Sequence, residues 1–242
     1  MRLVLLHTWA GTLELLRYPA FSVPTLTFPA LFFLLFAAPR SQADPNLVLA
    51  SFAGFAVLAV AFFQFGVGIA AERESPWERF VRTLPLRPRV RFAARVLSAA
   101  IFGLGSAALV VAAALGTTDA SLRASRWAAL AAALALGSVP FALLGITLGY
   151  WASPRSALPV ANILYLVFSF VGALWTSPAR LPPSIASLSP LVPTRQFGNV
   201  LRGAVEGNVW RPHDWFLLLG WTVVFGVLAA WGYRRDEGRR YT

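Results

Sequence analysis

The side chains that most often do chemistry in proteins are scarce in this sequence. It has no cysteine, which excludes disulfides, thiolate nucleophiles and cysteine-based metal sites. Its two histidines, His7 and His213, lie near opposite ends of the chain, with no carboxylate at metal-ligand spacing. All 21 basic residues are arginine, so the lysine of a nucleotide-binding P-loop is absent. We therefore expect no catalytic residue, no metal and no cofactor, and we expect any ATP to be bound by another polypeptide.

Strong hydrogen-bonding side chains are also rare in the long apolar stretches. These stretches contain no Asp, Glu, Arg or His, and we single out Gln64 and Asn162 as a possible substrate path. Ion-coupled secondary transporters usually carry ionisable residues inside the membrane, so that class is our alternative rather than our first hypothesis. An intramembrane enzyme would need a paired nucleophile and base or a metal site, and the sequence supplies neither.

The segment 72–91 combines charged and aromatic residues at helical spacing. Ser75 can cap a helix, Pro76 suits its first position, and Glu78 falls where a capping box places its carboxylate. The sequence predicts a short amphipathic helix that either docks a protein or lies at the membrane interface, and we favour docking. The residues that we assign to docking are Glu72, Arg73, Glu74, Trp77, Glu78, Phe80, Val81 and Leu84.

A largely apolar chain must position these residues. Apolar residues make up 57% of it and charged residues 13%, and its mean hydropathy is +0.64, which indicates that lipid surrounds most of it. A membrane-spanning helix needs about 20 apolar residues, and six charge-free stretches are long enough. We predict an all-α, polytopic membrane protein with a single transmembrane domain over 1–242. The six spans are expected near 21–38, 48–71, 93–116, 127–150, 158–176 and 214–233.

The arginines predict the orientation of the spans. Fourteen of them fall on the side of the two termini and seven on the other side, which favours both termini in the cytoplasm. They lie in short breaks between apolar runs rather than on a soluble domain, so we expect no nucleic-acid partner despite a net charge of +11. A cleavable signal peptide ending near 41–43 is the competing interpretation of the first span, but it would need an untypically long and acidic leading region.

Two further segments have helical character. Residues 1–17 predict an amphipathic helix on the inner leaflet, with Leu6, Trp9, Leu13 and Leu16 on its apolar side. In the extracytoplasmic segment 177–213, five prolines between positions 178 and 193 precede a run in which Phe197, Val200, Leu201 and Ala204 share a face. It is either a re-entrant or interfacial element that closes the outer mouth, or a surface loop with one amphipathic turn. Within the fourth predicted span, Gly145-x-x-x-Gly149 could form a close-packing face.

The loop after the second predicted span resembles that of the type-2 ATP-binding-cassette export permeases. That family typically has Glu-Arg/Lys-Glu-x-Gly-Thr-x-Glu there, then an apolar stretch and Leu-Pro; Ser75-Pro76 replaces its Gly-Thr pair. The resemblance rests on Glu72-Arg73-Glu74-Ser75-Pro76-Trp77-Glu78-Arg79 and Leu84-Pro85-Leu86, on Ser189-Pro190-Leu191, and on the tail Tyr233-Arg234-Arg235-Asp236.

The resemblance implies a permease subunit in the inner, cytoplasmic membrane. Two such subunits, as a homodimer or heterodimer, would surround a central path, and separate ATPase subunits would dock below them. Residues 72–91 would then hold the coupling helix of an ATP-driven exporter. The apolar and aromatic composition suits an amphipathic, drug-like or lipid-linked substrate. A haem-export-type permease is a variant within the same class and stays open.

Overall fold

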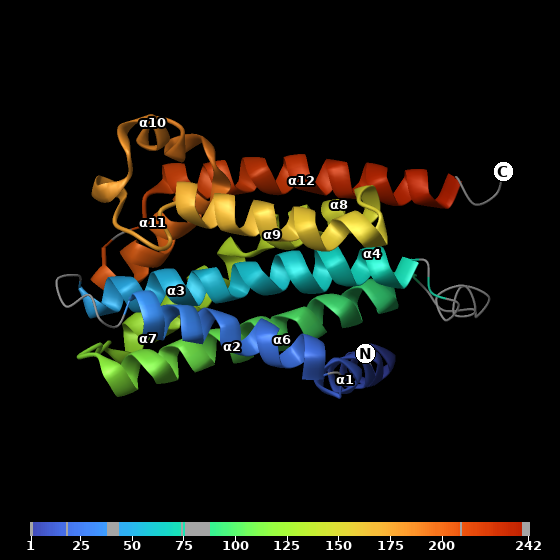
Figure 1. The fold of residues 1–242 in the computed structure, drawn as a ribbon, viewed down its shortest axis with the longest axis horizontal. Coiled ribbons are helices and arrows are strands. Elements are labelled where there is room, and N and C mark those ends of the chain that lie inside the picture. The colour runs from blue at the N-terminus through green and yellow to red at the C-terminus, as the bar shows by residue number, and fades with distance from the viewer. Residues whose placement is uncertain are drawn as a thin grey trace.

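The computed structural model describes residues 2–17, 19–37, 44–73, 75, 88–208 and 210–238. Within these residues the chain is helical and has no strand, as predicted for the all-α class. Most helices run along one axis of an elongated bundle (Figure 1). In chain order these are α2 (Pro19–Phe36), α3 (Pro45–Val60), α4 (Gly68–Arg73), α6 (Pro88–Thr117), α7 (Ala124–Gly137), α8 (Val139–Trp151), α9 (Pro154–Val171) and α12 (Pro212–Gly238).

Five helical stretches within the described residues are long and apolar enough to cross a membrane. They are Pro45–Arg73, Val96–Thr117, Ala124–Trp151, Pro154–Val171 and Pro212–Asp236. These stretches cover the second to the sixth predicted spans, although α9 begins and ends earlier than the predicted 158–176. The first predicted span falls on α2, whose apolar stretch Ser22–Phe36 is shorter. The first span, and with it the count of six, therefore stays a prediction.

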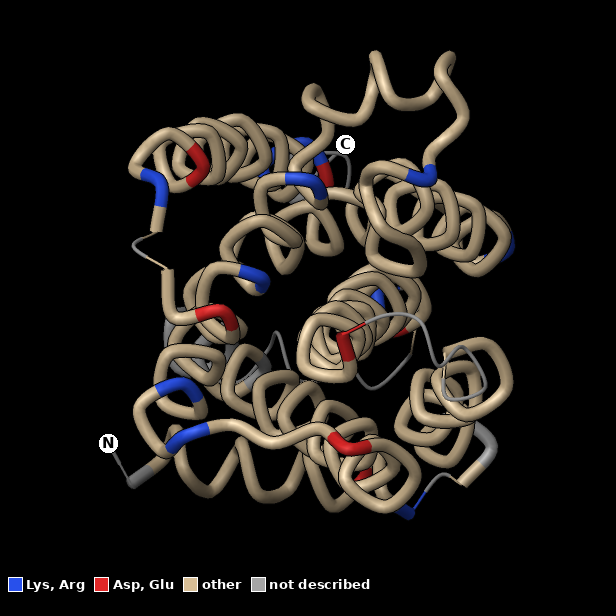
Figure 2. The backbone as a smooth tube through the Cα atoms, turned by 90° about the vertical axis from the view of Figure 1, so that its left-hand side faces the viewer, with Lys and Arg blue, Asp and Glu red and all other residues tan. Residues whose placement is uncertain are grey.

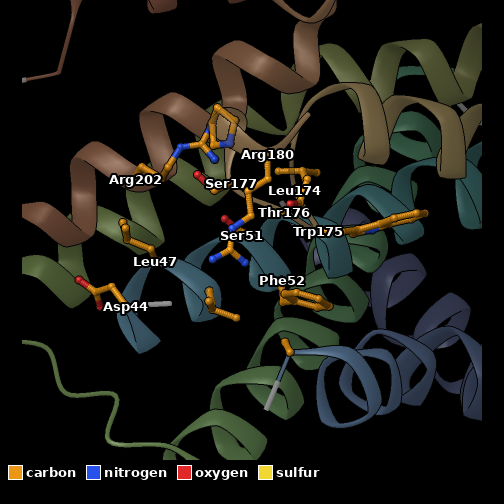
Figure 3. Close-up of a pocket in the computed structure, with 13 residues that line it drawn as sticks. Asp44, Leu47, Ser51, Phe52, Leu174, Trp175, Thr176, Ser177, Arg180 and Arg202 are labelled. Carbon is orange, nitrogen blue, oxygen red and sulfur yellow. The ribbon is translucent and has the colours of Figure 1, made fainter. Parts of the chain in front are cut away.

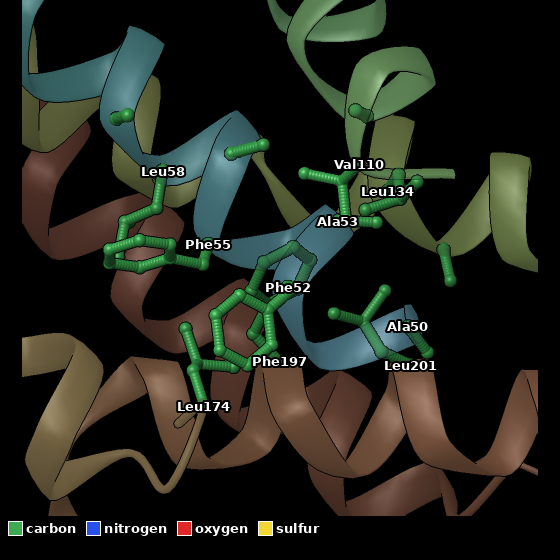
Figure 4. Close-up of a cluster of buried hydrophobic side chains, with 14 of the residues drawn as sticks. Ala50, Phe52, Ala53, Phe55, Leu58, Val110, Leu134, Leu174, Phe197 and Leu201 are labelled. Carbon is green, nitrogen blue, oxygen red and sulfur yellow. The ribbon is translucent and has the colours of Figure 1, made fainter. Parts of the chain in front are cut away.

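The helix formed by α3 and its continuation lies at the centre of the bundle. Its apolar window is 72% buried, against 22–44% for the other four candidate spans. In the view onto one end of the bundle, the other helices surround it (Figure 2). Side chains of α3 meet those of α6, α7 and α11 (Pro193–Glu206), together with Leu174, in one continuous core (Figure 4). The helices α2, α6, α7, α9 and α11 all pack directly on α3.

Two glycines bring α8 into backbone contact with the middle of this central helix. There, η1 (Ala61–Val67) makes a π-helical turn between α3 and α4. A Cβ on Gly145 would lie 3.0 Å from the Ala61 carbonyl carbon, and one on Gly149 would lie 2.7 Å from Cβ of Ile69. Only glycine permits this approach, so the close-packing role predicted for Gly145-x-x-x-Gly149 is confirmed.

At one end of the bundle, α1 (Arg2–Leu16) lies against α6 (Figure 1). A helix is present over Arg2–Leu16, and Leu6, Trp9 and Leu16 are exposed on it, but its amphipathic character and its place on the inner leaflet stay predictions. The side that faces the protein is polar rather than apolar. Thr8 is buried there, and Thr12 Oγ1 donates a hydrogen bond to Ser98 Oγ at 3.1 Å.

The opposite end of the bundle is built on the last turn of α9. Gly172 ends the helix, and the next residue, Ala173, takes the left-handed conformation with φ 58°. The amide of Ala173 donates to the Phe170 carbonyl at 3.0 Å and that of Leu174 to the Ser169 carbonyl at 2.9 Å, which is a Schellman motif. This motif stops α9 five residues before the end of the predicted fifth span.

The segment after α9 is a folded cap on this end of the bundle. It contains η2 (Pro178–Arg180), α10 (Pro183–Ala186), η3 (Ser189–Leu191) and α11 (Pro193–Glu206). Its hydroxyl groups satisfy carbonyls in the last turns of α9: Ser189 Oγ donates to Val171 O, and Thr194 Oγ1 to Phe168 O, both at 2.6 Å. A Cβ on Gly172 would collide with Thr194, so α9 and α11 approach as closely as their backbones allow.

One face of α11 is buried in the core. The predicted shared face of Phe197, Val200, Leu201 and Ala204 is confirmed, since all four side chains are at most 2% exposed. Phe197 fits between Gly54 of α3 and Gly137 of α7, where added Cβ atoms would lie 3.1 and 2.6 Å from its ring. The helix ends at Gly207, with φ 75°. This element is therefore a core helix rather than a single turn in a surface loop.

Candidate functional site

The last turn of α4, where the predicted docking loop begins, is held by two other helices. The Arg73 guanidinium donates from Nη1 to the Gly149 carbonyl at 3.0 Å and also to the Tyr150 carbonyl. Its Nε lies 3.4 Å from Oδ1 of Asp236 in α12. Arg73 therefore joins α4 to both α8 and α12, in a contact where its side chain is only 16% exposed.

Arg73 reaches α8 at the end of the helix that favours a cation. The last carbonyls of a helix lack partners within it and carry partial negative charge. Since α8 ends at Trp151, the carbonyls of Gly149 and Tyr150 are two of these groups, and Arg73 caps them. The guanidinium also lies over the Tyr150 ring, 5.8 Å from its centroid. The start of the loop is thereby fixed to the bundle.

Aromatic contacts hold α8 and α12 together beside Arg73. The rings of Tyr150 and Tyr233 meet edge to face with centroids 5.5 Å apart, and those of Trp151 and Trp231 with centroids 4.7 Å apart. The guanidinium of Arg235 lies over Trp151, 5.3 Å from the ring centroid. These pairs are worth about 0.5–1.5 kcal/mol each beyond their buried area. At the end that Arg73 contacts, α8 and α12 are therefore held together as a pair.

The structure describes two of the eight residues predicted to dock an ATPase. Glu72 is exposed, whereas Arg73 turns back onto the bundle. The docking role of the set stays a prediction. The other members, which lie outside the described residues, are Glu74, Trp77, Glu78, Phe80, Val81 and Leu84.

The structure places the two predicted path residues apart. Gln64 is buried in η1, and its Nε2 donates to Ser98 Oγ at 3.4 Å, so it faces α6. Asn162 lies on the exposed side of α9 and donates to the Leu158 carbonyl of its own helix at 3.1 Å. Their assignment to a substrate path stays a prediction.

Aromatic side chains form a cluster where α2, α3 and α9 meet. Phe55 stacks on Tyr165 with ring centroids 4.5 Å apart, and Phe32 meets Phe55 at 5.5 Å and Trp175 at 5.2 Å. The cluster is buried at Phe55 and Tyr165 and reaches the surface at Phe28, which is 43% exposed. These aromatic residues were not among the predicted site residues. Their spacing in sequence shows no shared face, because they come together only when the three helices are assembled.

The partners of Arg73 were not among the predicted site residues either. Asp236 was noted only as part of an arginine-rich tail, and Gly149 only as a packing residue. The capped groups are backbone carbonyls, which every residue has, so sequence carries no signal for them. The end of α8 at Trp151 was the available clue, because cations are favoured beside helix C-termini.

The described residues define a polytopic helical membrane protein whose central helix ends at Arg73, which two neighbouring helices hold. The sequence model of the ABC-2 family transporter proteins matches residues 18–231, and the chain belongs to this family. Membership identifies the chain as a membrane-spanning permease and implies pairing with an ABC ATPase subunit. No curated protein gave a match to the sequence.

Proposed function

We propose that the chain is the permease subunit of an ATP-driven exporter, coupled to a separate ATPase through residues 72–91. The observation that carries the proposal is the anchoring of Arg73 to α8 and α12. A partner that pushes on the loop would move α4 and, through Arg73, two further helices at once. Family membership supports the same role, because a permease of this kind does not act without its ATPase.

The proposed topology has six spans, with α2 as the first and both termini in the cytoplasm. In support, α2 runs along the bundle beside α3, although its apolar stretch is short (Figure 1). The helix α1 and the end of α12 lie at the same end of the bundle as the end of α4, while α10 and α11 lie at the other. The excess of arginine on the side of the termini favours that side as cytoplasmic. The membrane is then the inner, cytoplasmic one.

The proposed docking surface is the apolar side of the predicted coupling helix. Trp77, Phe80, Val81 and Leu84 would enter a cleft of the ATPase, with Glu72, Glu74 and Glu78 beside them. Arg73 would not enter the cleft, because its guanidinium is engaged by α8 and α12. Its proposed role is to pass movement of the loop to the spans.

The proposed substrate is an amphipathic, drug-like or lipid-linked compound, moved along a path between two permease subunits. The aromatic cluster of α2, α3 and α9 supports this, since aromatic rings suit apolar groups. Asn162 would face the second subunit, a copy of this chain or a related one. Gln64 could reach a path only if η1 separated from α6, because Ser98 now holds it.

The test is recovery of the ATPase that co-purifies with the permease. Trp77→Ala and Phe80→Ala should each weaken docking by about 2–4 kcal/mol, as expected for large anchors of an interface. Phe216→Ala is the matched control, because Phe216 is 71% exposed near the start of α12, far from the loop. Membrane levels are matched, and substrate-stimulated ATP turnover is measured alongside.

Equal recovery of the ATPase and equal ATP turnover in the wild type and all three variants would contradict the coupling assignment. The predicted helix would then lie on lipid instead of docking a protein. Transport by the chain in the absence of any nucleotide-binding partner would instead favour the ion-coupled secondary transporter.

A further inference from the structure

A cavity of about 280 Å³ lies beside α11, at the end of the bundle away from α4 (Figure 1), and Figure 3 shows residues that line it. Four separate segments form it: Ala37 just after α2, the first turns of α3, the chain from the end of α9 through η2, and one side chain of α11. None of these belongs to the loop or to the contacts of Arg73. The cavity therefore needs an explanation that coupling does not supply.

Two arginines from different segments line this cavity. Arg180 belongs to η2 and Arg202 to α11, and both contribute to its wall (Figure 3). Across the described part of the chain, the one ion pair within 4.0 Å joins Arg73 to Asp236, so neither cavity arginine has a carboxylate partner there. The two guanidinium groups thus line one small space, and neither forms an ion pair with Asp44, the carboxylate in the same wall.

The hydrogen bonds of Arg202 involve no charged acceptor. Its Nη1 donates to the Ala173 carbonyl at 3.3 Å and its Nη2 to Oδ1 of Asn199 at 3.2 Å, and both acceptors are neutral. Burial first, and then the nearby Arg195, lower the pKa of Arg202 to about 10, while Glu206 and Asp214 act in the opposite direction, so the group stays cationic at neutral pH. A partly buried cation whose hydrogen-bond acceptors are neutral is stabilised when an opposite charge joins it.

The remaining wall offers hydrogen-bond donors and apolar surface. Ser51 contributes a hydroxyl. The N-terminal end of α3, which carries partial positive charge, also borders the space. The wall has one carboxylate, Asp44, whose Oδ1 already accepts from the Asn46 amide at 2.8 Å. Phe52 lines the apolar part.

We propose that this cavity binds the phosphate or carboxylate group of an amphipathic anion, with Arg180 and Arg202 as its ligands. Guanidinium forks match the paired oxygens of both groups, and the apolar wall accepts the beginning of an attached chain. That the anion is the exported compound rests on the proposed function. Binding itself does not, because it needs neither ATP nor a partner.

The test is calorimetric titration of the permease in nanodiscs of zwitterionic phosphatidylcholine, with hexyl phosphate as the probe. Hexyl phosphate should bind the wild type, and Arg180→Gln should weaken binding tenfold or more. Arg180 is chosen because it is exposed, so its loss does not disturb the fold as loss of Arg202 could. Arg123→Gln removes the same charge from another exposed position at this end of the bundle and should leave the affinity unchanged.

Two comparison ligands separate the contribution of the negative charge from that of the apolar chain. Hexyltrimethylammonium has the same chain and the opposite charge, and should not bind. Inorganic phosphate should bind at least tenfold more weakly than hexyl phosphate. Equal binding of inorganic and hexyl phosphate would overturn the assignment to an amphipathic anion, and equal affinity of the Arg180→Gln and Arg123→Gln variants would overturn the site. Either failure would leave ATPase recovery by the wild type unaffected, so it is distinguishable from failure of the proposed exporter role.

Discussion

Arg73 and Asp236 lie 163 positions apart in sequence, yet Nε of the arginine is 3.4 Å from Oδ1 of the aspartate. The contact joins the end of the central helix to the end of the last one. Because Arg73 also caps α8, one side chain connects the beginning of the proposed docking loop to two helices. This connection makes Arg73 the residue whose replacement should separate docking from its effect on the spans.

Arg73→Gln should destabilise the protein by about 1–3 kcal/mol, because it removes charge-assisted hydrogen bonds from two helix-end carbonyls. Asp236→Asn should cost less, since it leaves those bonds in place. The measurement is unfolding of the purified proteins in detergent, combined with ATPase recovery and turnover. We expect Arg73→Gln to retain ATPase and to lose stimulated turnover. Loss of recovery instead would mean that Arg73 contacts the ATPase directly.

Gly145→Ala should destabilise the bundle by about 1–3 kcal/mol, because the new methyl group meets the backbone of Ala61, which cannot rotate away. Gly220→Ala in α12 is the control, since a Cβ there has no neighbour within 4 Å. It should be neutral or gain up to about 1 kcal/mol from helix propensity. The measurement is the unfolding midpoint of each variant in the same detergent. Equal midpoints would contradict the close packing of Gly145 against Ala61.

Phe197→Ala should cost about 3–5 kcal/mol, because the ring is wholly buried between two glycines and leaves a cavity that their backbones cannot fill. Leu188→Ala lies in the same cap but 56% exposed, and should change stability by less than about 0.5 kcal/mol. Denaturant unfolding of both variants provides the comparison. A small effect at Phe197 would show that α11 is not part of the core.

The orientation can be tested by single-cysteine labelling, because the natural chain has no cysteine to remove. Ser75→Cys should react only from the cytoplasmic side, and Ser121→Cys and Ser187→Cys only from outside. Ser121 and Ser187 are exposed, and the loop and cap that carry them lie at the end of the bundle opposite α4 (Figure 1). Labelling of Ser75→Cys from outside would reverse the topology and remove the docking argument.

Sequence predicted what depends on local spacing. The apolar face of α11 and the close-packing glycines of α8 were identified because helical periodicity and the absence of a side chain are both visible in the residues themselves. The end of α9 was placed too late. The left-handed residue of its Schellman motif is Ala173, and alanine carries no sequence signal for that conformation, whereas glycine would.

The anchoring of Arg73 and the anion-binding cavity could not be predicted in this way. Arg73 meets carbonyls that lie 76 and 77 residues further along the chain. Arg180 and Arg202 come to one space only because the cap folds back on α9 and α11 enters the core. In both cases the partners are brought together by packing of distant segments, which short-range patterns do not report.

The π-helical turn η1 has a further consequence for Arg73. Each residue of an α-helix advances about 100° around the axis, and a π-helical turn inserts one residue more than the regular helix needs. This extra residue sets the phase of α4 relative to α3. Deleting one residue from Ala61–Val67 would therefore rotate Arg73 by about 100°, away from α8 and Asp236, while every side chain of the docking loop stayed intact. The alignment of the loop with the bundle thus depends on the number of residues before it as well as on their identity.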